Sequence, residues 1–139
     1  MCKVSTYDDV THEVKNDLWY YSLEVFKNFR KNVFKHTDTI DFTCEISVTP
    51  VNKLYKRSFL IDNNCLFAEN FIFEDELFFY DVYLNAKRVS IINKNLYYYR
   101  VNRAGSTVTE STDTDYSDVL TIFKLIQQKL FFDICIFLL

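Results

Sequence analysis

One stretch dominates the sequence: Phe73-Glu74-Asp75-Glu76-Leu77-Phe78-Phe79, in which three consecutive carboxylates precede a run of aromatic and aliphatic residues. That run ends at Lys87-Arg88, so acids stand at its start and bases at its end. This polarity matches the helix macrodipole and predicts a helix of about three turns that begins within two residues of Asp75. The broad apolar face of this helix is predicted to be buried against a core.

The three carboxylates of this predicted helix have two interpretations. Glu74, Asp75 and Glu76 favour the positively polarised first turn of a helix, which is a structural role. A carboxylate held at that position by free backbone N–H groups, at the lip of a packed core, can also act as a general base. The triplet alone leaves both interpretations open.

Several blocks around the triplet carry a resemblance to a known family. Upstream lie residues 50–60, which contain Asn52-Lys53-Leu54-Tyr55, and then Asn63-Asn64 and Phe67; downstream lie residues 86–89, 96–100 and 103–106. In order and spacing, these blocks resemble the C-terminal half of the family-two glycosyltransferases of the GT-A fold. That family carries an asparagine-lysine-leucine-tyrosine segment, an aromatic-Glu-Asp-Glu motif and a tyrosine-rich strand that ends in arginine. The resemblance covers residues 47–109 and departs from the family at Val51, where relatives often have tryptophan.

The resemblance implies hexosyl transfer from a nucleotide-sugar to the hydroxyl of a glycan acceptor, with inversion at the anomeric carbon. It assigns the role of general base to Asp75 and places Glu74 beside it in the catalytic site. It places Asn52 and Lys53 in the active-site cleft, and Glu76 is grouped with them as a residue of acceptor or donor binding. Arg100, Arg103 and Ser106 surround the single glycine and have two interpretations: they bind a phosphate or a sugar hydroxyl of the donor or acceptor, or they belong to an exposed loop.

The resemblance also implies a divalent metal, Mg²⁺ or Mn²⁺, for the intact family enzyme. Asp113-Thr114-Asp115 spells the D-x-D motif that metal-dependent glycosyltransferases use. In the family, however, that motif lies upstream of the matched segment, whereas here it lies downstream. We therefore interpret Asp113 and Asp115 as capping residues and assign no metal ligand in this chain.

The expected fold is α/β, or α+β for an isolated fragment: the C-terminal half of a GT-A Rossmann-like domain, rich in helices, with a small mixed sheet and a hairpin. We expect one partial domain with a helical segment at 1–41, a glycosyltransferase-like acceptor-side core at 42–109 and an apolar helix at 110–139. Because residues 1–41 show no opening apolar strand and no β-α-β alternation, the nucleotide-binding half is expected to be missing. The chain then reads as a fragment, a split protein or a reduced descendant.

The local patterns predict five elements. Residues 1–16 are expected to form a polar lead-in, and apolar residues at helical spacing predict an amphipathic helix from Asp17 to about Lys35. A strand is expected over residues 42–49 and a helix over residues 52–60. A hairpin is expected with strands at 89–92 and 96–101 and a turn at Asn93-Lys94-Asn95.

Composition and charge exclude some classes of protein. The net charge of −3 and the dispersed Lys and Arg residues argue against a nucleic acid partner, which needs a clustered basic face. The four cysteines lack metal-ligand spacing and indicate reduced thiols in a cytoplasmic protein. Residues 130–139 are almost entirely apolar but shorter than the ~20 residues of a membrane span. They suggest contact with a protein or with the inner face of a membrane, so a non-catalytic interaction module is the alternative function.

Overall fold

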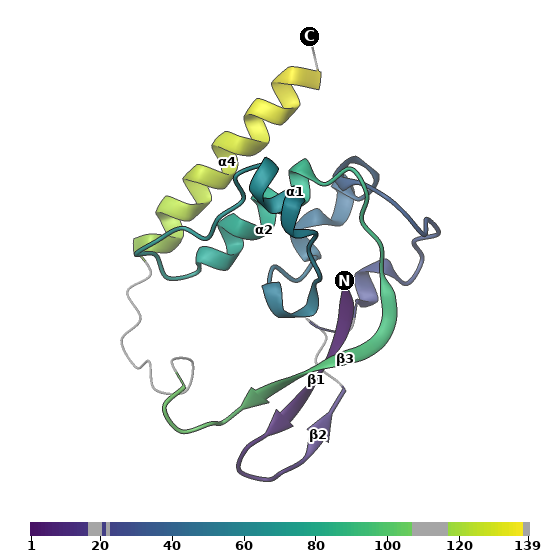
Figure 1. Cartoon of the computed structure of the whole chain (residues 1–139), viewed down its shortest axis with the longest axis vertical. Coiled ribbons are helices and arrows are strands. Elements are labelled where there is room, and N and C mark those ends of the chain that lie inside the picture. The colour runs from purple at the N-terminus through teal and green to yellow at the C-terminus, as the bar shows by residue number, and fades with distance from the viewer. Residues whose placement is uncertain (17–20, 22, 107–116, 138–139) are drawn as a thin grey trace.

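The computed structural model describes residues 1–16, 21, 23–106 and 117–137, which form a small mixed sheet beside a group of helices (Figure 1). The strands of the sheet are β1 (Cys2–Asp8), β2 (Val14–Lys15) and β3 (Ile92–Val101), in the order β2-β1-β3. The α-helices are α1 (Arg57–Asp62), α2 (Glu74–Asn85) and α4 (Ser117–Phe137). Short 3-10 helices at η2 (Glu24–Phe26), η3 (His36–Asp38), η4 (Ile40–Glu45) and η5 (Pro50–Asn52) connect them. The predicted α+β class, with a small mixed sheet, is confirmed.

The sheet contains a hairpin, but at a different place from the predicted one. β1 pairs antiparallel with β2 and parallel with β3. The hairpin predicted at Asn93–Asn95 is wrong, because β3 runs without a break through those residues. The pairing with β1 steps from Cys2↔Ile92 to Lys3↔Asn95, so the two intervening residues of β3 are taken up in an irregularity of the ladder.

The beginning of the chain is a strand and not the expected polar lead-in. β1 supplies the central strand of the sheet, and its residues Val4, Ser5 and Thr6 are buried. The Ser5 hydroxyl donates to the Asn16 side-chain oxygen over 2.6 Å, which satisfies one of these buried polar groups. The small hydroxyl side chains hide the apolar alternation that normally marks a strand, which is why the prediction failed.

Helix α2 agrees with the prediction. It begins at Glu74 and ends at Asn85, and Phe73 before it adopts a left-handed conformation with φ 68°. Six of its residues are buried, and they form two apolar clusters. One cluster contains Phe79 and Tyr83 together with Ile122 and Ile126 of α4. The helix is therefore the central element of the core, as its apolar face indicates.

Three other local predictions are wrong in the described residues. The helix expected from Asp17 to Lys35 is replaced, over residues 21 and 23–35, by turns, the short η2 helix and a bridge between Phe34 and Val89. Leu23 adopts φ 59°, which interrupts any helix there, and the rings of Phe26, Phe29 and Phe42 pack against one another instead. No strand forms over residues 42–49, where η4 is followed by irregular backbone, and the helix expected over 52–60 starts only at Arg57.

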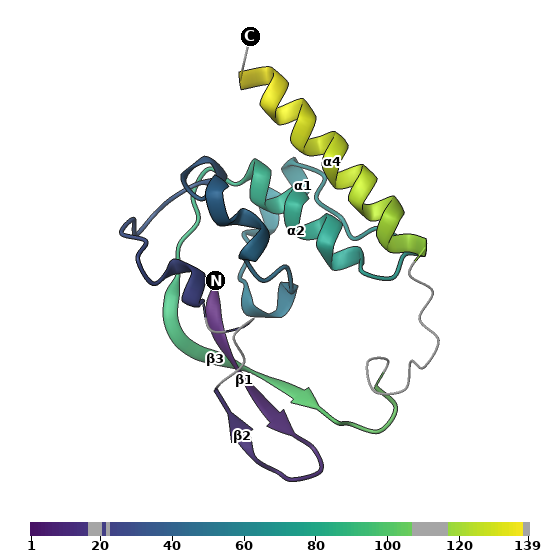
Figure 2. The same cartoon turned by 180° about the vertical axis from the view of Figure 1, so that it is seen from behind.

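Helix α4 packs on α2 and then extends beyond the other elements, as both views show (Figures 1 and 2). Ile122 and Ile126 are buried in the core, and Lys129 pairs with Asp81 of α2. Among the described residues, no helix has both the length and the apolar character needed to cross a bilayer.

Candidate functional site

The carboxylate of Asp75 lies half-buried at the start of α2. Burial and the neighbouring Glu74 raise the pKa of Asp75, while backbone N–H groups of Glu76 and Asp75, and the charge of Lys53, oppose the rise. A carboxylate with a raised pKa is a stronger base than an exposed one. Asp75 therefore has the properties that general-base chemistry requires.

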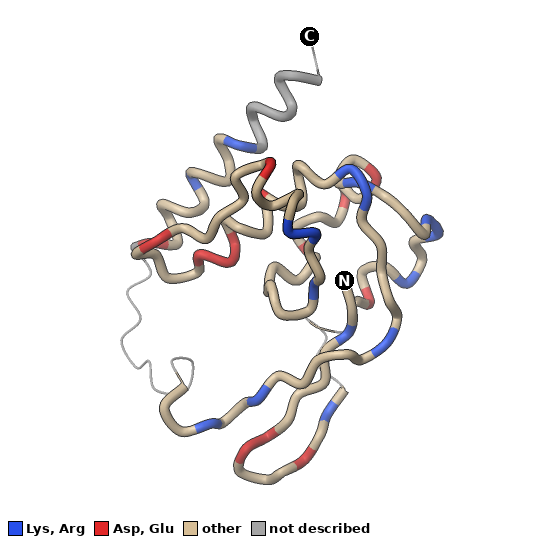
Figure 3. Tube along the Cα trace, in the orientation of Figure 1, with Lys and Arg blue, Asp and Glu red and all other residues tan. Residues whose placement is uncertain are grey.

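The other two carboxylates of the triplet flank Asp75 and are also half-buried. Burial, followed by the charge of Asp75, raises the pKa of Glu76. Figure 3 shows these acids together at the start of α2 and basic segments near its far end. The arrangement suits the helix dipole, so a structural role and a chemical role coexist here.

Lys53 is held rigidly beside α2. Its ammonium donates hydrogen bonds to the backbone oxygens of Ser47 and Thr49, both over 2.6 Å, and to the Asn52 side-chain oxygen over 2.7 Å. Burial lowers the pKa of Lys53 to about 7, and the negative charge of Asp75 opposes this shift. The three oxygen acceptors favour the protonated form, and in that form Lys53 places a positive charge near Asp75.

Asn52 is oriented by Lys53. Because an ammonium can only donate, the amide oxygen of Asn52 must face Lys53, and its Nδ2 group must point the other way. The Asn52 residue is only 1% exposed, and within the described residues its Nδ2 group has no hydrogen-bond partner. Asn52 and Lys53 thus form one unit at the end of η5.

A pocket of about 860 Å³ lies next to this unit. Its walls come from η5 and α1, from the second half of α2 and from the start of β3, and they include Asn52 and Lys53. Asp75 does not line the pocket. It lies one helical turn before the wall residue Phe79, however, so it continues the pocket-facing side of α2 towards the N-terminus.

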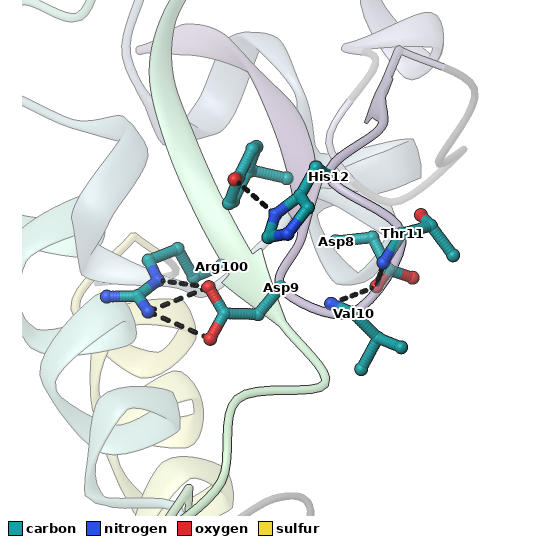
Figure 4. Close-up of polar contacts among 7 residues, drawn as sticks. Asp8, Asp9, Val10, Thr11, His12 and Arg100 are labelled. Carbon is teal, nitrogen blue, oxygen red and sulfur yellow. Dashed lines mark hydrogen bonds and ion pairs between the residues drawn. The ribbon is translucent and has the colours of Figure 1, made fainter.

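Arg100 lies at the opposite end of β3 from the pocket and is held by Asp9. Its guanidinium donates to both carboxylate oxygens of Asp9, with N···O distances of 2.7 to 3.2 Å (Figure 4). The neighbouring Asp8 carboxylate accepts the backbone N–H groups of Val10 and Thr11 and so shapes the β1–β2 turn. Arg100 therefore ties β3 to the end of β1.

Arg103 and Ser106 follow the end of β3 in a turn, where the Ser106 N–H donates to the Arg103 carbonyl over 3.2 Å. Neither residue lines the pocket. The structure thus brings Asn52 and Lys53 close to the carboxylate triplet but leaves Arg100, Arg103 and Ser106 at a separate place on the sheet.

The sequence reasoning missed two features of this region. It treated Asp9 as part of a solvated lead-in, although Asp9 is the partner of Arg100. It also missed the three oxygens around Lys53, since two of them are backbone carbonyls that no side-chain pattern reveals. Proline at position 50, at the start of the η5 turn, was the available signal that the backbone bends there.

The part of the chain that the structure describes contains no group of three or more His, Cys, Asp or Glu residues placed to hold a metal ion. Asp113 and Asp115 lie outside the described residues.

Comparison with known proteins gives one relationship. No family model matches the chain, and no solved structure matches it. The chain is 33% identical over 76 residues to the poly(ribitol-phosphate) beta-N-acetylglucosaminyltransferase TarS of Staphylococcus aureus, in strains Mu50 / ATCC 700699 and MW2. The alignment covers 52% of this chain and 13% of the S. aureus protein. The chain is thus similar, over about half of its length, to a small part of a glycosyltransferase.

Proposed function

We propose that this chain is the acceptor-side part of an inverting glycosyltransferase of the GT-A type and that Asp75 is its general base. The observation that carries the proposal is the half-buried Asp75 carboxylate with its raised pKa, placed at the start of the helix that forms the pocket wall. The similarity to a glycosyltransferase supports the same reading.

In the proposed reaction, Asp75 accepts the proton of an acceptor hydroxyl while that oxygen attacks the anomeric carbon of the donor. The new carbon–oxygen bond forms as the bond between that carbon and the nucleotide phosphate breaks, and the phosphate leaves with the electron pair. Attack from the face opposite the leaving group inverts the configuration. The positive charge of Lys53 opposes the rise in the pKa of Asp75, because a nearby positive charge favours the carboxylate.

The neighbouring side chains have supporting roles in this proposal. Glu74 raises the pKa of Asp75 and so strengthens it as a base. Asn52, Lys53 and Glu76 contribute to the binding of the acceptor.

At the far end of the sheet, Arg100, Arg103 and Ser106 are proposed to contact a part of the donor or acceptor that lies away from the reacting carbon. Arg100 would do so as the Arg100–Asp9 pair, because Asp9 already holds its guanidinium.

The substrates follow from the relative. Its name specifies transfer of N-acetylglucosamine to poly(ribitol phosphate), and we propose a nucleotide-activated hexose or N-acetylhexosamine as donor and a glycan or polyol phosphate as acceptor. The intact enzyme is expected to use Mg²⁺ or Mn²⁺. The described residues offer no ligand set for that ion. A cytoplasmic location, at the inner face of the membrane, fits these substrates.

A transplantation experiment tests the proposal. Since the alignment covers 13% of the S. aureus protein, the corresponding part of that protein is replaced by residues 47–109 of this chain, which contain the carboxylate triplet. We expect the chimera to transfer N-acetylglucosamine to poly(ribitol phosphate). A chimera that melts like the parent enzyme and binds the nucleotide-sugar, but transfers no sugar, would refute the proposal.

Helix α4 supports a second candidate function, that of a non-catalytic interaction module. Leu120 and Phe123 are 67% and 60% exposed on this helix, while Ile122 and Ile126 on its other side are buried. A contiguous exposed apolar patch marks a contact with a partner, and these two side chains are proposed to belong to one. Two measurements test whether α4 is such a surface: flotation of the chain with anionic lipid vesicles and sedimentation of the chain without vesicles. If it is, the double variant Leu120→Ser with Phe123→Ser should differ from the wild type in these measurements. Unchanged behaviour would remove this candidate.

A further inference from the structure

The pocket beside α2 is lined by positively charged side chains, Lys56, Lys87 and Arg88, that have no role in the proposed reaction. We infer that it binds a phosphate group of a polymeric acceptor, one or more repeating units away from the hydroxyl that reacts at Asp75. This inference rests on the proposed function and adds to it a substrate class and a binding site.

The first observation is the gathering of positive charge. Lys56, Lys87 and Arg88 line the pocket and are exposed, and Lys53 lies deeper in its wall. Asp62 is the one carboxylate among the lining residues. Within the described part of the chain, none of the three exposed bases takes part in an ion pair of the kind that Lys129 or Arg100 makes.

The second observation is that these bases come from separate segments. Lys56 precedes α1, whereas Lys87 and Arg88 follow the end of α2. Bases that follow a helix are often explained by the helix dipole, but this explanation does not cover Lys56. Their convergence on one pocket indicates a site for an anion, since a cation cluster without acidic partners favours negatively charged ligands.

The third observation concerns the walls between these bases. Aromatic residues occur in each of the main wall segments: Tyr55, Phe59, Phe79, Tyr83 and Tyr97. Such rings pack against the C–H faces of sugars and polyols, while their edges and hydroxyl groups tolerate water. The volume of about 860 Å³ lies within the ~300–1,000 Å³ that is usual for ligand pockets.

Distance along α2 decides which phosphate the pocket holds. Asp75 and Ala86 are eleven residues apart, which corresponds to about 16 Å at a rise of about 1.5 Å per residue. The phosphates of a nucleotide-sugar must lie next to the reacting carbon, so bases at the other end of α2 are too far away to hold them. A phosphate further along a polymeric acceptor can reach these bases while its reacting hydroxyl lies at Asp75.

Binding of defined oligomers to the full chain tests this inference. Ribitol 5-phosphate, synthetic ribitol-phosphate oligomers of two and four units, neutral ribitol and UDP-N-acetylglucosamine are each titrated and followed by calorimetry. We expect affinity to rise at least tenfold from the monomer to the four-unit oligomer, with neutral ribitol too weak to measure. The triple variant Lys56→Gln, Lys87→Gln, Arg88→Gln should lose at least tenfold in oligomer affinity and most of its dependence on salt.

A matched triple variant controls for net charge. Arg30→Gln, Lys35→Gln and Lys124→Gln remove the same charge from exposed positions outside the pocket and should leave binding unchanged. Equal losses in both triple variants, equal binding of neutral ribitol, or competition of UDP-N-acetylglucosamine for the pocket would each overturn the inference. The transplanted chimera would still report on Asp75 in that case, so failure of the pocket and failure of the proposed function are distinguishable.

Discussion

The ammonium of Lys53 lies 5.1 Å from the centre of the Phe79 ring. This contact fixes the segment after η5 against α2, one helical turn from Asp75. It also connects the pocket, the core and Asp75, because Lys53 lines the pocket, Phe79 belongs to the core and the charge of Lys53 acts on Asp75.

We predict that Lys53 makes folding stability depend on pH. Its pKa falls to about 7 in the folded chain from a usual value of 10.5, so between these values the unfolded chain binds more protons than the folded chain. Stability must then rise with pH across this window and be lowest, as far as Lys53 is concerned, below pH 7. Urea unfolding at several pH values should show that the free energy of unfolding of the wild type rises, relative to that of Lys53→Met, from pH 7 towards pH 10.

The exposed Lys56 provides the control for that measurement. Lys56→Met removes the same charge at an exposed position and is measured over the same range. A slope with pH for Lys53→Met no larger than that for Lys56→Met would mean that the three oxygen acceptors keep the Lys53 ammonium protonated throughout.

A buried pair of hydroxyl groups stabilises the C-terminal end of α2. The Tyr83 hydroxyl and the Thr39 hydroxyl lie 2.6 Å apart in the core. Tyr83→Phe removes this hydrogen bond and should lower the free energy of unfolding by about 0.5–1.5 kcal/mol. Tyr98→Phe, at an exposed position of β3, should change it by less than about 0.5 kcal/mol in the same denaturant titration. Similar losses for both variants would show that the pair contributes nothing specific.

Phe79 is predicted to be the most costly side chain of α2 to truncate. It is only 2% exposed and packs against both Tyr80 and Tyr83. Phe79→Ala should lower the free energy of unfolding by about 3–5 kcal/mol, because it removes a buried ring and leaves a cavity. Phe123→Ala, at an exposed position of α4, is the matched control and should cost far less in thermal melting. A small effect of Phe79→Ala would contradict the placement of α2 at the centre of the core.

The sequence predicted α2 well because the signals for that helix are local. The acids of its first turn, the buried face and the bases beyond its end all lie within one short stretch. The sequence predicted two short strands in place of the single strand β3, because the strand that pairs with β3 is far away in the chain. Asn93-Lys94-Asn95 is typical of a turn, but the seven residues of β1 pair along β3 and hold those residues in the strand. Long-range pairing overrides local turn chemistry in this case.

The candidate site was predicted in part for the same reason. The carboxylate triplet and the Asn52-Lys53 pair stand in recognisable motifs, and the fold brings them close together. The pocket could not be predicted, because its walls come from Met1, Cys2 and two further segments, within residues 51–63 and 79–97, whose contacts depend on the whole fold. The ion pair of Arg100 with Asp9 joins residues 91 positions apart, and nothing in either local pattern indicates the other.

The most direct test of the account compares single carboxylate variants of the transplanted chimera. Asp75→Asn should reduce the initial rate of sugar transfer at saturating donor by about 10²- to 10⁴-fold, because an amide cannot accept the proton. Its melting temperature and donor affinity should stay unchanged. Glu76→Gln should have a much smaller effect on the rate, and Glu74→Gln an intermediate one, since Glu74 acts on the pKa of Asp75. Equal rate losses for all three variants, in step with losses of melting temperature, would show that the triplet is structural and that Asp75 is not the base.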